Sequence, residues 1–246
     1  MNDFSRRLRD LASSGLPGAA VGGTRHMSKV WKYRLEYGLI LALMGLFRAL
    51  PRPVALKTGE ALGLFAGCVL RIRRSVVDAN LEIAFGREMT RSERHRIARR
   101  CYRHYATVMV DTLRLFGKPA AAWYQLVERV EGLDATRDLL REQGGLVVMT
   151  AHLGYWELGY VFPLLGMPMC VVAKPAHNPY IQAMIDKGRE QEEGYDVMST
   201  GASARKFVTY LRQGWVLGFV SDQDARRHGI FVDFFGRPAS TATGGP

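Results

Sequence analysis

The sequence predicts an α/β fold, in which a largely parallel, mixed β-sheet is flanked by helices and preceded by membrane-associated helices. Three observations lead to this prediction. Two apolar segments bordered by basic residues lie within the first 75 residues, and a long, capped helical pattern follows them. From residue 145 onward, short β-rich runs alternate with helical patterns, which is typical of a parallel sheet with crossover helices.

The composition indicates one globular unit with an anionic partner. Hydrophobic residues make up 48% and charged residues 23% of the 246 positions, which excludes pervasive disorder and a polytopic membrane protein. Cys68, Cys101 and Cys170 form no disulfide or zinc pattern, so we expect a reducing compartment and no metal site. The net charge of +11 fits nucleic acid, anionic lipid, a phosphorylated substrate or an acidic carrier protein. Charge alone does not choose among these partners.

The amino-terminal part is predicted to contain an extension and a membrane-binding region. Residues 1–26 are rich in Gly, Ala, Ser and Arg and end before Met27, which predicts a disordered extension or a misassigned start. Residues 27–75 are predicted to form anchoring or interfacial helices. Their uncharged stretch 37–47 is shorter than the roughly 20 residues that a spanning helix needs. A buried core helix and a cleaved signal are the alternatives for this stretch.

Two further basic segments precede the sheet region. The apolar stretch 61–70 ends in Arg71, Arg73 and Arg74, as expected of a helix lying on an anionic membrane or of a core helix with a solvated end. Thr90 and Glu93 form a capping-box pattern that begins a helix over 91–115. Five arginines in its first half form either a solvated face or a contact with lipid phosphates. The spacing predicts one buried stripe made of Ile97, Cys101, Tyr105, Val108 and Thr112.

Residues 76–246 are predicted to form the main domain, whose sheet begins after Gly145. Strands are expected over 146–151, 169–174, 195–199, 216–221 and 230–235, with helices over 156–165, 179–193 and 203–213. Asn178 is the predicted N-cap of the second of these helices, with Pro179 at its first position. Because a parallel sheet binds ligands at the carboxyl ends of its strands, the chemistry is expected at the loops that hold His152, Lys174 and Asp222.

The segment TAHLGYWE is the strongest candidate for a catalytic motif. It places His152 just after a strand and Glu157 at the start of a helix, so the carboxylate can fold back to hold the imidazole. An imidazole oriented by a carboxylate is a general base for a hydroxyl group. Backbone N–H groups near Gly154 could bind an oxyanion. The structural alternative is a hydrogen-bonded histidine at a strand end and a glutamate that caps a helix.

Three ordered blocks resemble the bacterial lipid A biosynthesis acyltransferases. They are HLGYWE, the stretch that begins KPAHNPYIQAMIDKGRE, and SDQDARRHGIFVDFFGRPASTATG. This family is part of the wider lysophospholipid and glycerolphosphate acyltransferase superfamily with its His-x4-acid motif, and the resemblance runs from about Val30 to the last residue. It implies a glycerolphosphate acyltransferase-like fold and an acyltransferase domain over 76–246.

The resemblance also implies roles for individual residues. His152 would be the general base and Glu157 its orienting acid, while Arg189 would bind a phosphate or help to stabilise the oxyanion. Lys174 stands where many relatives carry arginine, and it keeps the charge but not the bidentate geometry. The expected substrate-binding residues are Arg189, Lys174, Asn178, Gly154 and Asp222. Among them, Asn178 is expected chiefly to cap its helix, and Asp222 to shape the site.

The implied reaction moves a fatty acyl group from a thioester, with acyl carrier protein as donor, to a hydroxyl of an anionic lipid A precursor. It would take place at the cytoplasmic face of the inner membrane, without metal, organic cofactor or acyl-enzyme. The alternatives are another lipid acceptor, or a non-catalytic basic protein that binds a membrane; no nucleic-acid motif is evident, so no such partner is expected. The chain ends at TATGGP, inside a block that continues in relatives, so we expect it to be truncated.

Overall fold

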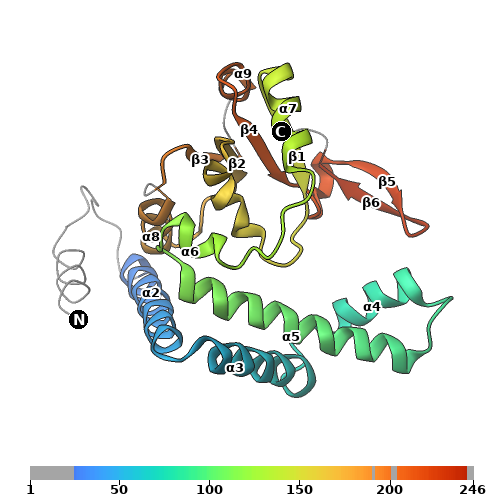
Figure 1. Cartoon of the computed structure of the whole chain (residues 1–246). Coiled ribbons are helices and arrows are strands. Elements are labelled where there is room, and N and C mark those ends of the chain that lie inside the picture. Colours follow the sequence, from blue (N-terminus) through green and yellow to red (C-terminus); the bar gives the residue numbers. More distant parts are fainter. Residues whose placement is uncertain (1–24, 190–191, 201–203, 243–246) are drawn as a thin grey trace.

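The computed structural model describes residues 25–189, 192–200 and 204–242. The predicted disordered extension over 1–26 therefore lies almost entirely outside the described residues. The first half is helical (Figure 1). Its elements are α2 (Arg25–Ala49), α3 (Arg52–Leu64), the π-helix η1 (Phe65–Val69), α4 (Arg74–Phe85), α5 (Arg91–Leu115), α6 (Ala120–Tyr124) and α7 (Leu133–Gln143). The long helix α5 runs beneath the sheet domain, with α3 along its lower side and α2 beside its left end in this view.

Helix α5 begins where the sequence predicts, and its cap has the predicted geometry. The Thr90 side chain accepts a hydrogen bond from the Glu93 N–H, and the Glu93 carboxylate accepts one from the Thr90 N–H at 2.8 Å. These two bonds satisfy donors that a helix start would otherwise leave free.

The predicted buried stripe of α5 is largely wrong. Of its five residues only Val108 is buried, whereas Ala98, Val110, Asp111 and Leu115 are buried with it. The reason is that small residues on α3 and η1 determine which face of α5 packs against them. A Cβ at Gly63 would lie 2.2 Å from the Tyr102 carbonyl oxygen, and one at Gly67 would lie 2.3 Å from the Tyr102 ring. The two helices therefore pack backbone against backbone along the face that carries Tyr102.

Helix α2 contains the whole uncharged stretch 37–47. Met44 and Phe47 are buried, and Phe47 packs with Ala55 and Val110 in a small core between α2, α3 and α5. Trp31, Leu35 and Leu39 are exposed on the same helix. No single helix among the described residues is long and apolar enough to cross a membrane. One bent pair, Arg52–Val69 with Arg74–Phe85 at 89°, meets the length and composition criteria when taken together.

The second half contains a four-stranded, fully parallel sheet with the order β1-β4-β2-β3. Its strands are β1 (Leu146–Thr150), β2 (Met169–Ala173), β3 (Tyr195–Ser199) and β4 (Val216–Val220). The connecting segments include the 3₁₀-helix η2 (Trp156–Leu165), α8 (Pro179–Arg189) and α9 (Ala204–Arg212). These agree with the predicted strands and helices to within a few residues; α8 is described as far as Arg189, and residues 192 and 193 beyond it are not helical.

Helices cover one face of the sheet, and α9 covers the other face over β2 and β4, whereas Val147 and Met149 of the edge strand β1 are exposed. On one face, Met169 and Val216 pack with residues of α6, α7 and η2, including Trp123, Leu140 and Tyr160. On the other face, Cys170 and Leu217 pack against Phe207 of α9.

The fifth predicted strand is not part of this sheet. Residues Ile230–Phe234 form β5, which pairs antiparallel with β6 (Arg237–Thr241) in a separate two-stranded hairpin, preceded by the short helix η3 (Arg226–His228). The hairpin projects away from the domain beside α4 (Figure 1), and Phe235 contacts Phe85 edge to face. A two-residue turn at Phe235 and Gly236, both with positive φ, reverses the chain here and prevents a crossover.

Candidate active site

His152 and Asp222 meet at the carboxyl edge of the sheet because their strands are neighbours. Thr150 ends β1 and is in register with Val220, which ends β4, so each functional residue lies two positions beyond a paired residue. The His152 N–H donates to Asp222 Oδ2 at 2.9 Å, and His152 Nδ1 lies 2.7 Å from Asp222 Oδ1. The Asp222 carboxylate thus holds both the backbone and the ring of His152.

This contact assigns the two ring nitrogens. Nδ1–H donates to the carboxylate, which makes Nε2 the ring nitrogen that carries the basic lone pair. The Gln223 amide nitrogen lies 3.4 Å from Nε2. Partial burial tends to raise the pKa of Asp222, but the hydrogen bonds from the His152 ring and N–H outweigh it and lower that pKa below its ordinary value. Asp222 is therefore ionised at neutral pH, as an orienting carboxylate must be.

The predicted pairing of His152 with Glu157 is not the one that the structure forms. The Glu157 carboxylate lies 3.5 Å from Arg189 Nη2, while Asp222 occupies Nδ1 of His152. The physical reason is that η2 turns toward the end of α8, where the Tyr160 hydroxyl also donates to the Gly188 carbonyl at 3.2 Å. Arg189 Nε is buried and has no hydrogen-bond partner among the described residues.

Trp156 is a site residue that the sequence reasoning missed. Its ring lies 5.4 Å from the His152 ring, nearly edge to face, and 6.3 Å from the Tyr105 ring of α5, nearly parallel to it. Trp156 therefore fills the space between the imidazole and α5. The available signal was its position in HLGYWE, where a large aromatic residue directly precedes the acidic residue of the motif.

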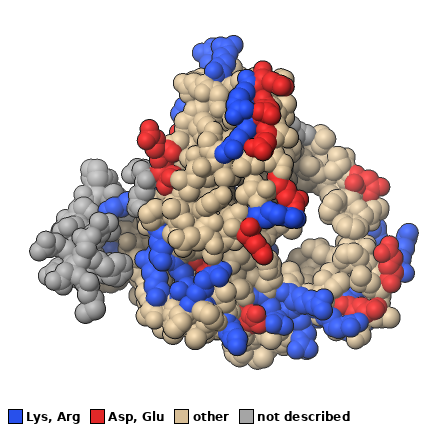
Figure 2. Space-filling view, in the orientation of Figure 1, with Lys and Arg blue, Asp and Glu red and all other residues tan. Residues whose placement is uncertain are grey.

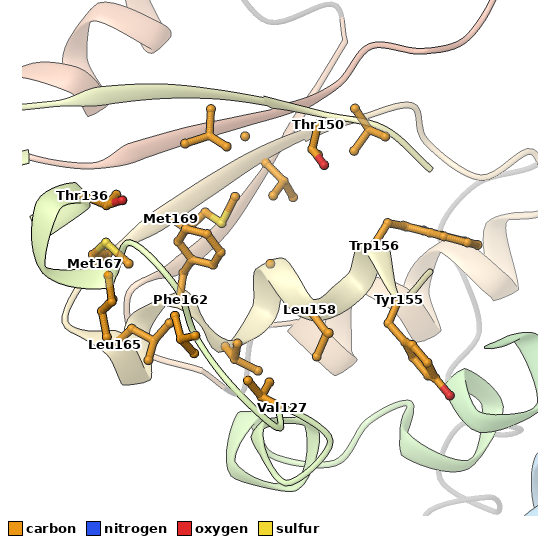
Figure 3. A pocket seen from close by; sticks show the side chains of 18 of the residues that line it. Val127, Thr136, Thr150, Tyr155, Trp156, Leu158, Phe162, Leu165, Met167 and Met169 are labelled. Atoms are coloured by element: carbon orange, nitrogen blue, oxygen red, sulfur yellow. The ribbon is translucent and has the colours of Figure 1, made fainter. Parts of the chain in front are cut away.

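An apolar pocket of about 360 Å³ opens beside the loop that carries His152. Ala151 and Leu153, the chain neighbours of His152, line it, together with Tyr155 and Trp156. Figure 3 shows Tyr155 and Trp156 at one end and Met167 and Leu165 at the other. The pocket thus extends from the loop that carries His152 into the space between η2 and the sheet.

The other predicted binding residues lie in different surroundings. Gly154 has φ +58°, a left-handed conformation that suits glycine, and it lets the loop turn between His152 and Tyr155. Lys174 is exposed at the end of β2. Asn178 is buried, and its side chain caps α8 by accepting from the Tyr180 N–H at 3.0 Å, which confirms the predicted cap. Its amide also donates to Glu36 at 3.0 Å, so Asn178 joins α8 to α2.

Within the described ranges, no group of three or more His, Cys, Asp and Glu side chains is arranged to hold a metal ion.

Comparison with known proteins identifies relatives of one kind. The family model described as "Bacterial lipid A biosynthesis acyltransferase" matches residues 26–246. The chain is 28% identical over 202 residues to the lipid A biosynthesis palmitoleoyltransferase of Escherichia coli (strain K12). The aligned region covers 79% of this chain and 63% of that protein. It is 25% identical over 209 residues to the lipid A biosynthesis lauroyltransferase of the same strain, covering 83% and 66%. The chain thus spans less than two thirds of the length of these relatives.

Proposed function

Because this chain belongs to the bacterial lipid A biosynthesis acyltransferase family, we propose that it transfers a fatty acyl group from a thioester to a hydroxyl of a lipid A precursor. The observation that carries this proposal is the His152–Asp222 pair, held on a loop whose residues Ala151 and Leu153 line an apolar pocket. An oriented imidazole supplies the base for a hydroxyl, and the pocket offers an apolar chain a dry surface.

In the proposed reaction, Nε2 of His152 takes the proton of the acceptor hydroxyl as the oxygen attacks the thioester carbonyl carbon. The tetrahedral oxyanion accepts hydrogen bonds from backbone N–H groups near Gly154, with the Arg189 guanidinium, held by Glu157, as a further positive charge. The intermediate then collapses, the carbon–sulfur bond breaks, and the thiolate takes the proton from the imidazolium. The ester and a free thiol are the products.

The pocket beside His152 is proposed to hold the acyl chain of the donor. Its lining consists mostly of aliphatic and aromatic side chains, and it begins at the loop where the carbonyl must lie. The relatives named for palmitoleoyl and lauroyl transfer support a fatty acyl donor. We propose acyl carrier protein as the carrier of the thioester, since an acidic carrier suits a chain with a net charge of +11.

The amino-terminal helices are proposed to bind the cytoplasmic face of the inner membrane, where an anionic glycolipid acceptor is available. Phe65, Val69, Leu70 and Ile72 are exposed around the end of α3 and η1. Arg71 and Arg73 lie within the same segment, and Lys and Arg side chains gather over the lower helices in Figure 2. Exposed apolar side chains among basic ones are typical of an interfacial segment on anionic lipid.

The proposed function is tested by replacing the base. Purified His152→Ala protein, given acyl carrier protein thioester and a lipid A precursor, should form ester at least about 10²-fold more slowly than the wild type, because general-base catalysis is lost. Mass spectrometry of the lipid product measures the rate.

His104→Ala is the matched control, because His104 is an exposed histidine of α5. It should retain the wild-type rate. Ester formation by folded His152→Ala at the rate of His104→Ala would overturn the proposal.

A further inference from the structure

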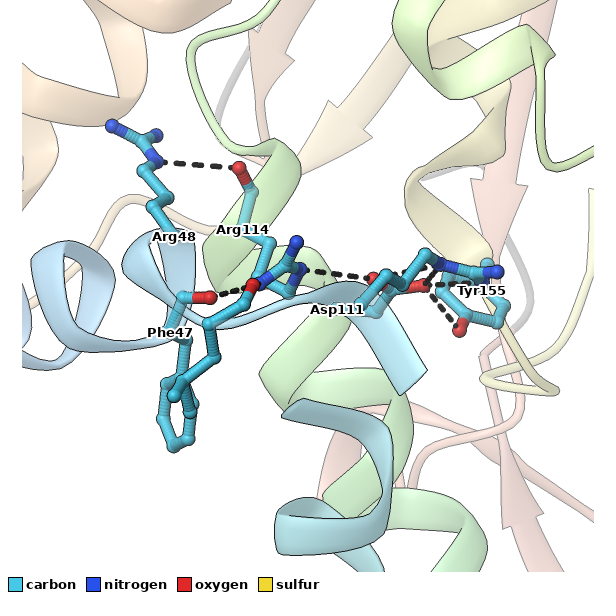
Figure 4. Close-up of polar contacts among 7 residues, drawn as sticks. Phe47, Arg48, Asp111, Arg114 and Tyr155 are labelled. Atoms are coloured by element: carbon cyan, nitrogen blue, oxygen red, sulfur yellow. Dashed lines mark hydrogen bonds and ion pairs between the residues drawn. The ribbon is translucent and has the colours of Figure 1, made fainter. Parts of the chain in front are cut away.

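Asp111 is a buried carboxylate that joins three parts of the molecule. It lies on α5, is 1% exposed, and accepts hydrogen bonds on Oδ2 from Arg52 Nη2 at 2.7 Å and Nε at 3.0 Å. The Tyr155 hydroxyl donates to the same oxygen at 3.0 Å, and Arg114 Nε lies 3.8 Å from Oδ1 (Figure 4). A carboxylate buried without such partners would be strongly destabilising, so this group of contacts specifies one arrangement.

Two of these partners connect the site to the amino-terminal helices. Tyr155 ends the loop 151–155 that carries His152, and Arg52 is the first residue of α3. Arg114 also donates to the Leu50 carbonyl at 2.6 Å, which fixes the corner between α2 and α3 against α5. The position of α3 is thereby linked to the position of the catalytic loop through one carboxylate.

The loop is held at both ends by aspartates from different elements. Asp222 holds His152 near its start, and Asp111 holds Tyr155 at its end. Between them, Gly154 has a left-handed conformation and Leu153 is exposed, so the loop has little packing of its own. Burial, followed by the charge of Asp111, raises the pKa of Tyr155 to about 12, so its hydroxyl remains a donor at neutral pH.

We propose that Asp111 and Tyr155 are positioning residues for the acyl transfer: their hydrogen bond, with Arg52 as counter-ion, sets where the loop 151–155 places the His152 imidazole relative to the pocket. The inference rests on the proposed function, because it assigns a purpose to the placement of the base. It also predicts that the position of α3 affects turnover, although Arg52 does not line the pocket.

A purely structural role for these residues predicts a different result. Loss of the Tyr155 hydroxyl would then reduce thermal stability, and the folded molecules would still turn over at the wild-type rate. A positioning role instead changes kcat of folded enzyme, because small misplacements of a reacting group are costly. It leaves KM for the thioester little changed, since the ring of Tyr155 still lines the pocket.

Tyr155→Phe in the full chain is the test, with kcat and KM measured for acyl carrier protein thioester and normalised to folded protein by circular dichroism. We expect kcat to fall about tenfold or more with an unchanged KM. Arg52→Gln should lower kcat in the same direction. The double variant should lose less than the product of the two single losses, because both act through Asp111.

Tyr210→Phe is the matched control. Its hydroxyl also donates to an aspartate, Asp196, but this pair joins α9 to β3 away from the loop. It should leave kcat at the wild-type value. If Tyr155→Phe matches Tyr210→Phe in kcat while His152→Ala is inactive, the positioning role is wrong and the proposed function stands. If His152→Ala is itself active, the proposed function has failed.

Discussion

A carboxylate that accepts the Nδ1–H of an imidazole fixes both its tautomer and its direction, and Asp222 does this for His152. Glu157 instead contacts Arg189, which brings a guanidinium beside η2. The two acidic residues therefore have different partners. Asp222 orients the imidazole, whereas Glu157 holds the Arg189 guanidinium beside η2.

The two carboxylates can be distinguished by mutation. Asp222→Asn should lower kcat on the order of 10²- to 10⁴-fold, because an amide cannot orient the imidazole in the tautomer that leaves Nε2 basic. Mass spectrometry of the ester that the wild type and the variant form from the same substrates measures this loss.

Glu157→Gln provides the comparison for that measurement. The variant keeps the Asp222 contact to His152 and loses the ion pair with Arg189, so the pH dependence of kcat should remain that of the wild type. A large change in pH dependence in Glu157→Gln but none in Asp222→Asn would show that Glu157 is the orienting acid.

At the scale of elements, close helix packing determines what α5 presents to the site. Gly59, Gly63 and Gly67 of α3 and η1 let Tyr102 and Ala106 approach at backbone distance. This contact turns Asp111 inward and leaves Tyr105 free to stack on Trp156. The glycines of α3 thus influence the site although none of them lies in it.

Gly63→Ala tests this packing. Its Cβ would lie 2.2 Å from the Tyr102 carbonyl oxygen, so the helices must separate, and we expect a loss of roughly 1–3 kcal/mol in the free energy of unfolding. Denaturant unfolding followed by circular dichroism measures it.

Gly45→Ala is the helical control, since its Cβ meets no atom within 4 Å. That variant should be unchanged or more stable by about 0.5–1 kcal/mol, because alanine favours helix more than glycine does. Equal stabilities of the two alanine variants would contradict close packing at Gly63.

At the scale of the whole molecule, the exposed apolar side chains are unevenly distributed. Many belong to α2, α3, η1 and α4, and a second group belongs to the β5-β6 hairpin, which includes Phe231 and Phe234. The hairpin and α4 project on the same side of the domain in Figure 1 and touch through Phe85 and Phe235. This arrangement supports the proposal that the helical half, rather than the α7 end, faces the membrane.

Vesicle binding tests the orientation. The wild type should bind vesicles containing phosphatidylglycerol better than purely zwitterionic ones, and added salt should weaken the binding because it screens the arginines. Leu70→Glu, which places a charge at a 57% exposed position, should reduce binding several-fold in a flotation assay.

Leu139→Glu is the matched control, because Leu139 is a 46% exposed leucine on α7, at the opposite end of the molecule. It should bind as the wild type does. Equal losses in both variants would contradict the proposed orientation.

Much of the fold follows from local sequence patterns. The capping box of α5, the Asn178 cap of α8, and the positions of β1 to β4 depend on residues close together in the chain, so spacing and residue type were sufficient. The family resemblance also depends only on the order of residues, and the match over residues 26–246 confirms it.

What local patterns could not supply is strand order. Sequence reasoning gave His152 the nearest acidic residue along the chain, five positions away, whereas the sheet places β4 next to β1 and so gives it Asp222, seventy positions away. The same limit applies to Asp111, whose partners Arg52 and Tyr155 come from distant segments. Residue types and their spacing were sufficient to identify the chemical groups and the elements that carry them. Which groups meet depends on how the strands and helices pack, because hydrogen bonds act over about 3 Å and pairing across a sheet is set by packing, not by chain distance.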